Sequence, residues 1–248
     1  MQRQKINGDA SLSMFVAAVS LAFALSGCGG GGGGGGAMAP APTGSYDLQA
    51  GISMLVSAGL SSDVTVSGSL LVNGSTTPLS GSGTVTFSAG VSATFNGTAA
   101  LSQTENVSAT LMAAGQSTQY SSAVADYYAS ASNAYLGQTG NEYDVAQTPF
   151  TYPTTVSGGE SAVLGTVSRY SDSTMSVSLG SAQISYQVTA ATSTGGPVLV
   201  AITEQYYDTQ NNLTETDVIS YDLTAAGVLS LVSASVQDAS GTLILTAQ

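Results

Sequence analysis

Apolar residues alternate with small polar residues over most of the chain beyond position 45, and this period of two limits the fold more than any other feature. Successive side chains of an extended strand point to opposite faces, so alternation gives a strand one apolar and one polar face. The apolar stripes fall in Tyr46–Ile52, Val64–Val72, Val85–Phe95, Val107–Met112, Met175–Val188, Val198–Ile202, Ile219–Leu223, Leu229–Leu231 and Leu243–Leu245. The pattern predicts a domain built from half-buried strands.

Turn residues separate these stripes, and two pairs are typical of tight hairpins. Asn73-Gly74 and Asn96-Gly97 both tolerate the positive φ angles that two-residue hairpin turns require. Short strands without a convincing helical crossover favour antiparallel pairing, so we expect an all-β sandwich or a closed or half-open barrel. One segment, Ala123–Tyr135, also has apolar residues at helical spacing, which leaves a short helix and a strand equally open there.

The pattern is interrupted near the middle of the chain. Pro149, Pro153 and Gly158-Gly159 break the alternation, and a division into two smaller β domains at 149–159 is one interpretation. Each half alone would have a thin hydrophobic core. We therefore expect a single β domain over residues 45–248.

Charge is scarce and one-sided. Only 7% of residues are charged, against roughly 25% in an average soluble domain. Asp9, Arg3 and Lys5 lie in the first 27 residues, so the rest of the chain has 14 acids and one base, Arg169. Such a chain cannot neutralise phosphates, which excludes nucleic-acid binding and recognition of anionic lipid head groups through a basic patch. Since 43% of residues are apolar, we expect a folded domain rather than disorder.

The first 27 residues have the composition of an export signal. Arg3 and Lys5 form a positive start, and Met14–Leu25 is an apolar stretch of 12 residues, too short to cross a bilayer as a helix. The motif that follows, Leu25-Ser26-Gly27-Cys28, resembles the lipobox of bacterial lipoproteins. That resemblance implies cleavage before Cys28, diacylglycerol on its sulfur and acylation of the new amino terminus. The alternative is an ordinary signal peptide with a chance cysteine.

The residues after the cysteine suggest where the chain goes. Gly29 and Gly30 stand where the family's inner-membrane retention signal would place Asp, which implies sorting to the outer membrane, on its periplasmic or its surface face. Eight glycines followed by an Ala/Pro segment predict a flexible linker over residues 28–44. Parts of the stretches Tyr152–Val156 and Gly165–Tyr170 resemble uncharacterised β-rich lipoproteins of Gram-negative bacteria, which have no assigned activity.

Most catalytic residue types are missing. The sequence has no histidine, its one lysine lies in the leader, and its one cysteine is the predicted lipidation site. Imidazole-based triads, His-ligated zinc and Schiff-base chemistry are therefore excluded. We expect a non-enzymatic protein with no catalytic residues and no cofactor. Paired carboxylates are the main chemistry left, and they keep a glycan hydrolase open as the weakest alternative.

One predicted hairpin gathers acids on the apolar face of its strands. With the turn at Thr209–Asn212, the register pairs Asp208 with Leu213, Val198 with Leu223, Val200 with Tyr221, Ile202 with Ile219, Glu204 with Asp217 and Tyr206 with Glu215. Like charges directly opposite each other destabilise a strand pair, so Glu204, Glu215 and Asp217 need water or a cation nearby. Either the hairpin tip projects into solvent, or the three carboxylates form a candidate Ca²⁺ site.

Tyrosine next to aspartate is a recurrent pair, at 46–47, 143–144, 207–208 and 221–222. Neighbours in a strand face opposite ways, so a core tyrosine with an exposed aspartate accounts for each pair, and an aromatic binding surface is the alternative. The sequence thus favours a membrane-anchored envelope lipoprotein with a non-catalytic interaction or structural domain. A carrier or chaperone for lipids or amphiphiles is the second hypothesis, and the ligand, whether protein, glycan or lipid, stays open.

Overall fold

The computed structural model describes residues 44–248 except positions 73, 192 and 194. The predicted signal peptide, the lipobox with Cys28 and the linker up to residue 43 lie outside the described residues. The elements are α1 (Leu48–Ala58), β1 (Leu60–Val72), β2 (Ser75–Phe87), β3 (Val91–Phe95), β4 (Thr98–Ala113), β5 (Gln116–Ala129), β6 (Tyr135–Thr139), β7 (Tyr143–Phe150), β8 (Ser161–Tyr170), β9 (Ser178–Thr189), β10 (Val198–Tyr207), β11 (Leu213–Leu223), β12 (Leu229–Asp238) and β13 (Gly241–Ala247).

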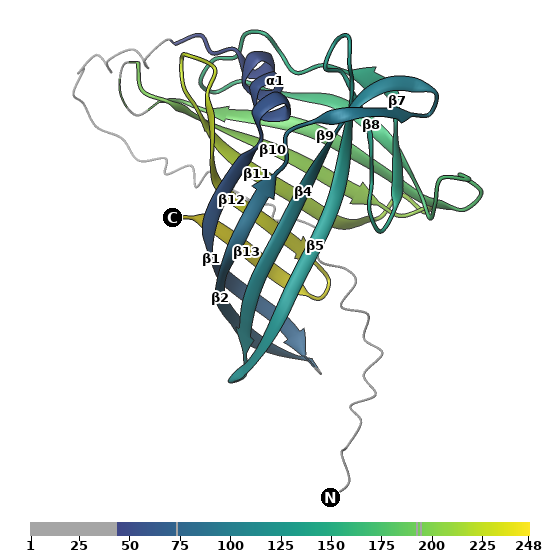
Figure 1. Cartoon of the computed structure of the whole chain (residues 1–248). Helices are drawn as coiled ribbons and strands as arrows, with labels where there is room; N and C mark the ends of the chain where they lie inside the picture. Colours follow the sequence, from purple (N-terminus) through teal and green to yellow (C-terminus); the bar gives the residue numbers. More distant parts are fainter. Residues whose placement is uncertain (1–43, 73, 192, 194) are drawn as a thin grey trace, which may run out of the picture.

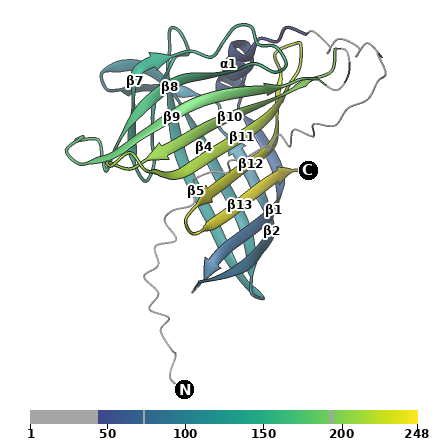
Figure 2. The same ribbon diagram turned by 180° about the vertical axis from the view of Figure 1, so that it is seen from behind.

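The strands form one antiparallel sheet that closes on itself. Each strand pairs with the next one in sequence, except that β2 does not pair with β3: β4 pairs with β3 along its first part and with β2 along its second part. The β2–β4 pairing and the β1–β13 pairing complete a barrel of twelve strands, with β3 as an extra strand outside it. Figures 1 and 2 show the barrel from two sides. The all-β prediction is confirmed, and of its two architectures the structure has the barrel.

Both predicted tight hairpins are present. Val72 pairs with Ser75, so two residues connect β1 to β2. Phe95 pairs with Thr98, and Asn96 and Gly97 between them have φ angles of 46° and 77°. Positive φ at both central residues is the geometry that matches the twist of the flanking strands. The segment around Pro149 to Gly159 connects β7 to β8, two strands that are neighbours in the same sheet.

The strand expected at Tyr46–Ile52 is wrong, because this segment enters the helix α1. Leu48, Ile52 and Leu55 satisfy helical spacing as well as part of an alternating stripe, and all three are buried. The side chain of Asp47 caps the helix by accepting a hydrogen bond from the Ala50 N–H at 2.8 Å. The cap at Asp47 and the burial of one helical face favour the helical period over the strand period of two in this segment.

The helical alternative for Ala123–Tyr135 is also wrong. The first part of this segment continues β5, and a turn then leads to β6. Val124 and Asp126 line the barrel interior together with Tyr128. Tyr127 faces outward, where its ring stacks on that of Phe95 at a centroid distance of 4.6 Å. Two adjacent tyrosines that are covered on opposite faces of one strand produced the apparent helical spacing.

Helix α1 closes one end of the barrel (Figure 1). The helix and the residues before it bind the connections at that end: Gln49 N–H donates to Pro153 O, Tyr46 Oη to Gly196 O, Asn133 Nδ2 to Ser53 Oγ, and Gly90 N–H to Val56 O. Gln103 of β4, which is buried, donates from Nε2 to the carbonyls of Leu55 and Ser88. The cap is therefore tied to four loops and to one strand of the wall.

None of the residues described in 44–248 forms such a cap at the other end. The β1–β2 and β4–β5 hairpins extend past it on one side of the barrel (Figures 1 and 2). On β9 the wall is apolar inside and polar outside: the inward Ala182, Ile184, Tyr186 and Val188 are buried, and the outward positions between them are serine and glutamine. No helix among the described residues combines the length and the apolar character needed to cross a membrane.

Gly180 marks a point where the barrel wall is tightly coiled. Its φ angle is 122°, which L-residues rarely adopt, and a Cβ there would lie 2.0 Å from the carbonyl oxygen of Tyr207 on the next strand. The ladder also shifts register beside it, between Arg169 and Tyr170. Glycine kinks of this kind let a sheet curve into a closed barrel.

Replacing this glycine tests its role in barrel closure. Gly180→Ala should lower the free energy of unfolding by about 2 kcal/mol or more, because the methyl group meets a backbone oxygen and the φ angle is strained. Ser181→Ala, one residue further along the same strand, should change it by less than about 0.5 kcal/mol. Urea denaturation followed by circular dichroism measures both, and equal effects would contradict the assignment.

Candidate functional site

A belt of polar side chains runs around the inside of the barrel near its uncapped end. It consists of two groups of inward-facing residues, each directly paired from strand to strand: Asp126, Gln138, Asp144 and Arg169 on β5 to β8, and Tyr206, Glu215 and Asp238 on β10 to β12. We call these seven residues the polar belt. The interior ends in an apolar floor at α1 and in a polar mouth on the other side of the belt.

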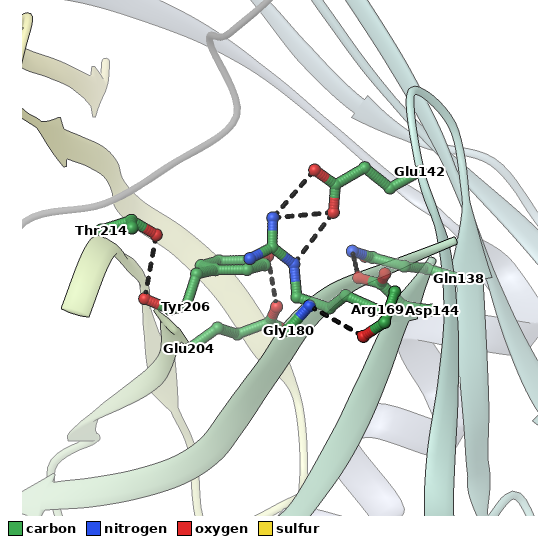
Figure 3. A network of polar contacts seen from close by, with 9 residues as sticks. Gln138, Glu142, Asp144, Arg169, Gly180, Glu204, Tyr206 and Thr214 are labelled. Atoms are coloured by element: carbon green, nitrogen blue, oxygen red, sulfur yellow. Dashed lines mark hydrogen bonds and ion pairs between the residues drawn. The ribbon is translucent and has the colours of Figure 1, made fainter. Parts of the chain in front are cut away.

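Arg169 is the belt's only cation, and it is 8% exposed. Its Nε donates to Glu142 Oε2 at 2.9 Å and its Nη2 to Glu142 Oε1 at 2.8 Å, the bidentate geometry that is strongest for this pair. The guanidinium also lies over the ring of Tyr206, 4.6 Å from its centroid. Figure 3 shows these groups together at the mouth. The one positive charge is thus fully engaged.

The predicted hairpin has the expected pairing along most of its length. Glu204 lies opposite Asp217 and Tyr206 opposite Glu215, and the three apolar pairs below them are also as predicted. The last pair is wrong by one residue: a register shift after Tyr206 pairs Tyr207, not Asp208, with Leu213. Asp208 instead closes the turn, where its N–H donates to Asn212 O.

The tip of this hairpin is exposed at residues 209–214, as one interpretation expected, but Glu204 and Asp217 do not lie on it. Glu204 and Asp217 both line an internal cavity. Glu204 Oε2 accepts a hydrogen bond from Tyr206 Oη at 2.7 Å, and Asp217 Oδ1 is buried without a hydrogen-bond partner. Within residues 44–248 as described, no group of three or more acidic side chains is arranged to hold a metal ion. Glu215 lines the mouth rather than the cavity.

The cavity lies between α1 and the polar belt and has a volume of about 110 Å³, measured as the space open to the centres of water molecules. By that measure a single water needs about 10–15 Å³, so several waters or a small ligand fit. Ile52 and Leu55 of α1 and Leu245 of β13 form part of its floor. Six tyrosines line it: Tyr120, Tyr128, Tyr135, Tyr152, Tyr206 and Tyr221. Four carboxylates do so as well: Glu105, Asp126, Glu204 and Asp217.

A second, wider pocket of about 400 Å³ lies at the mouth. Glu142, Arg169, Glu215 and Asp238 line it, and it shares Val124, Gln138 and Tyr206 with the cavity. The two spaces therefore adjoin, and the mouth connects the cavity to the uncapped end of the barrel.

Burial makes these carboxyl groups hard to ionise. Desolvation, with the nearby Glu204 as a smaller cause, raises the pKa of Glu105 to about 7. Desolvation likewise raises the pKa of Asp217 and of Asp126 well above the ordinary value, with other carboxylates adding to it. The pKa of Asp144 rises to about 7 although Gln138 donates to its Oδ2 at 2.8 Å. One arginine cannot balance this many acids in a confined interior.

Sequence reasoning missed three of these acids. Glu105, Asp126 and Asp144 are each in phase with apolar residues on their strands: Glu105 with Val107, Asp126 with Val124 and Asp144 with Ala146. An acid at an apolar position of an alternating stripe was the available signal. The Tyr-Asp pairs also show that the phase of an acid relative to the apolar residues of its strand decides which way it faces.

The expectation of a core tyrosine with an exposed aspartate suits Tyr221-Asp222 and is wrong for Tyr143-Asp144. In the second pair Asp144 is fully buried, and its Oδ1 lacks a hydrogen-bond partner. Tyr143 faces outward, where its ring stacks on Phe95. The phase of the pair is set by Ala146, which shares the inner face with Asp144.

Comparison of the chain with protein-family models, with curated proteins and with solved structures finds no match. The functional argument therefore depends on the geometry of the cavity and its mouth.

The raised pKa values predict an unusual pH dependence of stability. A carboxyl group whose pKa is higher in the folded chain than in the unfolded chain stabilises the fold below its unfolded pKa. That contribution is lost as the pH rises through the folded value, which is about 7 for Glu105 and Asp144 and about 8 for Glu215. One such group lowers the free energy of unfolding by about 2–3 kcal/mol from pH 5 to pH 8, so we expect a total fall of at least that size.

Glu105→Gln should reduce this fall, because a neutral amide replaces a group that ionises in the interior. Asp222→Asn removes one charge from the outer face of β11 and should leave the slope unchanged. Denaturant titrations at several pH values measure the slopes. Stability that stays constant or increases from pH 5 to pH 8 would contradict the raised pKa values of the interior carboxyl groups.

Proposed function

We propose that this chain is a non-catalytic binding protein of the bacterial envelope, whose barrel carries a small amphiphilic molecule in its interior. The observation that carries the proposal is the cavity itself, which is closed by α1, floored by apolar side chains and connected to a polar mouth. Ligand sites are typically concave and mostly apolar, with a few convergent polar groups that fix orientation. Of the two non-catalytic hypotheses, the cavity favours a carrier over a purely structural module.

The barrel's size supports a carrier. A barrel of about eight strands is just wide enough for its own side chains to fill, and the diameter grows with strand number. This barrel has twelve strands, and large side chains such as Tyr128, Tyr135 and Tyr221 take up only part of the added space. Helix α1 blocks one exit, so the mouth is the route by which a ligand enters and leaves.

A lipid anchor at Cys28 is part of the same proposal. Acylation at Cys28 would hold the chain at the outer membrane, on its periplasmic or its surface face, since several acyl chains make a stable anchor. The described chain begins at the capped end, where Tyr46 pairs with Val156.

Filling the cavity tests the carrier function. Ala234 faces the cavity from β12, so Ala234→Phe should place a ring in the space that a ligand would occupy. Native mass spectrometry of the purified mature chain should show bound amphiphile, and the variant should lose it. Gln237→Phe, on the outer face of the same strand, is the matched control and should keep it. A wild-type chain that never retains or binds an amphiphile would overturn the proposal.

The anchor has its own test. Cys28→Ala should abolish incorporation of labelled fatty acid and move the protein from the membrane to the soluble fraction, because the thiol is the predicted acylation site. Ser26→Ala keeps a small residue in the lipobox and should be processed normally. Unchanged labelling of the Cys28→Ala variant would refute the lipoprotein assignment.

A further inference from the structure

We infer that the molecule carried in the cavity is a cation: an amphiphile whose ammonium group lies between Glu204 and Asp217 and whose apolar body lies on the floor formed with α1. This inference depends on the proposed function above and names its ligand class. Four observations support it: the cavity is lined by acids and no bases, one buried acceptor has no hydrogen-bond partner, the walls are aromatic, and the cavity has an acidic end and an apolar end.

The lining has negative groups and no positive ones. Four carboxylates line the cavity, and none of the described residues that line it is basic. Arg169 lies at the mouth and is held there by Glu142 and Tyr206. Bringing a negative ligand into this interior would add like charge at low dielectric, whereas a positive one would stabilise the ionised forms of the lining carboxyl groups.

An unsatisfied acceptor independently points to a missing donor. Asp217 Oδ1 is buried, belongs to a residue that lines the cavity and has no hydrogen-bond partner among the described groups. Buried acceptors are nearly always paired, because an unpaired one costs about 1–3 kcal/mol. Glu204 lies directly opposite Asp217, and the one hydrogen bond described for its side chain comes from Tyr206. An ammonium between the two residues supplies N–H donors to both.

The walls suit the rest of such a molecule. Tyr128, Tyr135, Tyr152 and Tyr221 line the cavity, and aromatic faces attract organic cations. Ile52, Leu55 and Leu245 below them offer hydrocarbon surface that a bare metal ion would not use. On β10 and β11 the acids lie on the mouth side of apolar residues: Val200 and Ile202 lead to Glu204 on β10, and the opposite strand places Ile219 and Tyr221 on the α1 side of Asp217. An amphiphile would therefore enter with its apolar end first.

Proton release would accompany binding. Burial raises the pKa of Glu105 to about 7 and that of Asp217 well above its ordinary value, so these groups hold more protons in the empty cavity than exposed carboxyl groups would. A cation beside them favours the ionised forms and expels protons. Asp126 on β5 and Arg169 on β8 face the same interior and contribute to the same balance.

Three probes that share one hydrocarbon chain separate charge from hydrophobicity: octylammonium, 1-octanol and octanoate. Isothermal titration calorimetry of the mature chain at about pH 7.5 should give octylammonium a dissociation constant at least about tenfold below that of 1-octanol, with octanoate the weakest. Repeating the ammonium titration in two buffers of different ionisation enthalpy should show proton release.

The variants Glu204→Gln and Asp217→Asn, alone and combined, should remove the preference for octylammonium over 1-octanol. Asp63→Asn combined with Asp222→Asn removes two charges from the outer face and serves as the control, with the preference intact. Circular dichroism verifies the fold of each variant. The proton-release measurement uses the wild-type chain, so it tests the inference even where a variant does not fold.

The outcomes distinguish the two proposals. Binding of 1-octanol that equals or exceeds binding of octylammonium would overturn the cationic ligand and keep the carrier. Tighter binding of octanoate would do the same. Failure of all three probes to bind would overturn the carrier and the inference together.

Discussion

The pairing of β2 with β4 is the constraint on which the rest of the structure depends. It closes the sheet, and a closed sheet turns one face of every strand into an enclosed interior. Inward acids then lose contact with bulk water, which raises the pKa of Glu105 to about 7. The same closure creates an open rim that needs a cap, and α1 supplies it at one end through hydrogen bonds to the connecting loops.

The β10–β11 hairpin shows how far local sequence determines structure. A recognisable turn and strict alternation fix its register, so Glu204 could be placed opposite Asp217 from the sequence. The bulge after Tyr206 could not, because it depends on how the strand end bends into the turn at Asp208. At Leu48 and Ile52 two periods overlapped, and the helix forms because the barrel end offers a surface that its apolar face covers.

The site was harder to predict than the fold, for a topological reason. Alternation is the same in a sandwich and in a barrel, so the sequence could not show that Glu105 of β4 and Glu204 of β10 share one interior. Their interaction arises only when strands distant in sequence are bent into a ring. What the sequence does contain is the phase of each acid, which for Asp126 and Asp144 is that of the core. An acid on the apolar face of a stripe is best interpreted as an interior group of unknown purpose rather than as a surface charge.

The position of Arg169 inside a strand also affects how easily proteases cleave this domain. A protease that cleaves after basic residues finds one target in residues 44–248, and it lies within β8, paired with strands on both sides and 8% exposed. The turns, where chains are usually nicked, carry no lysine or arginine. Cleavage by such an enzyme therefore requires the barrel wall to open first, so its rate would report the stability of the wall itself.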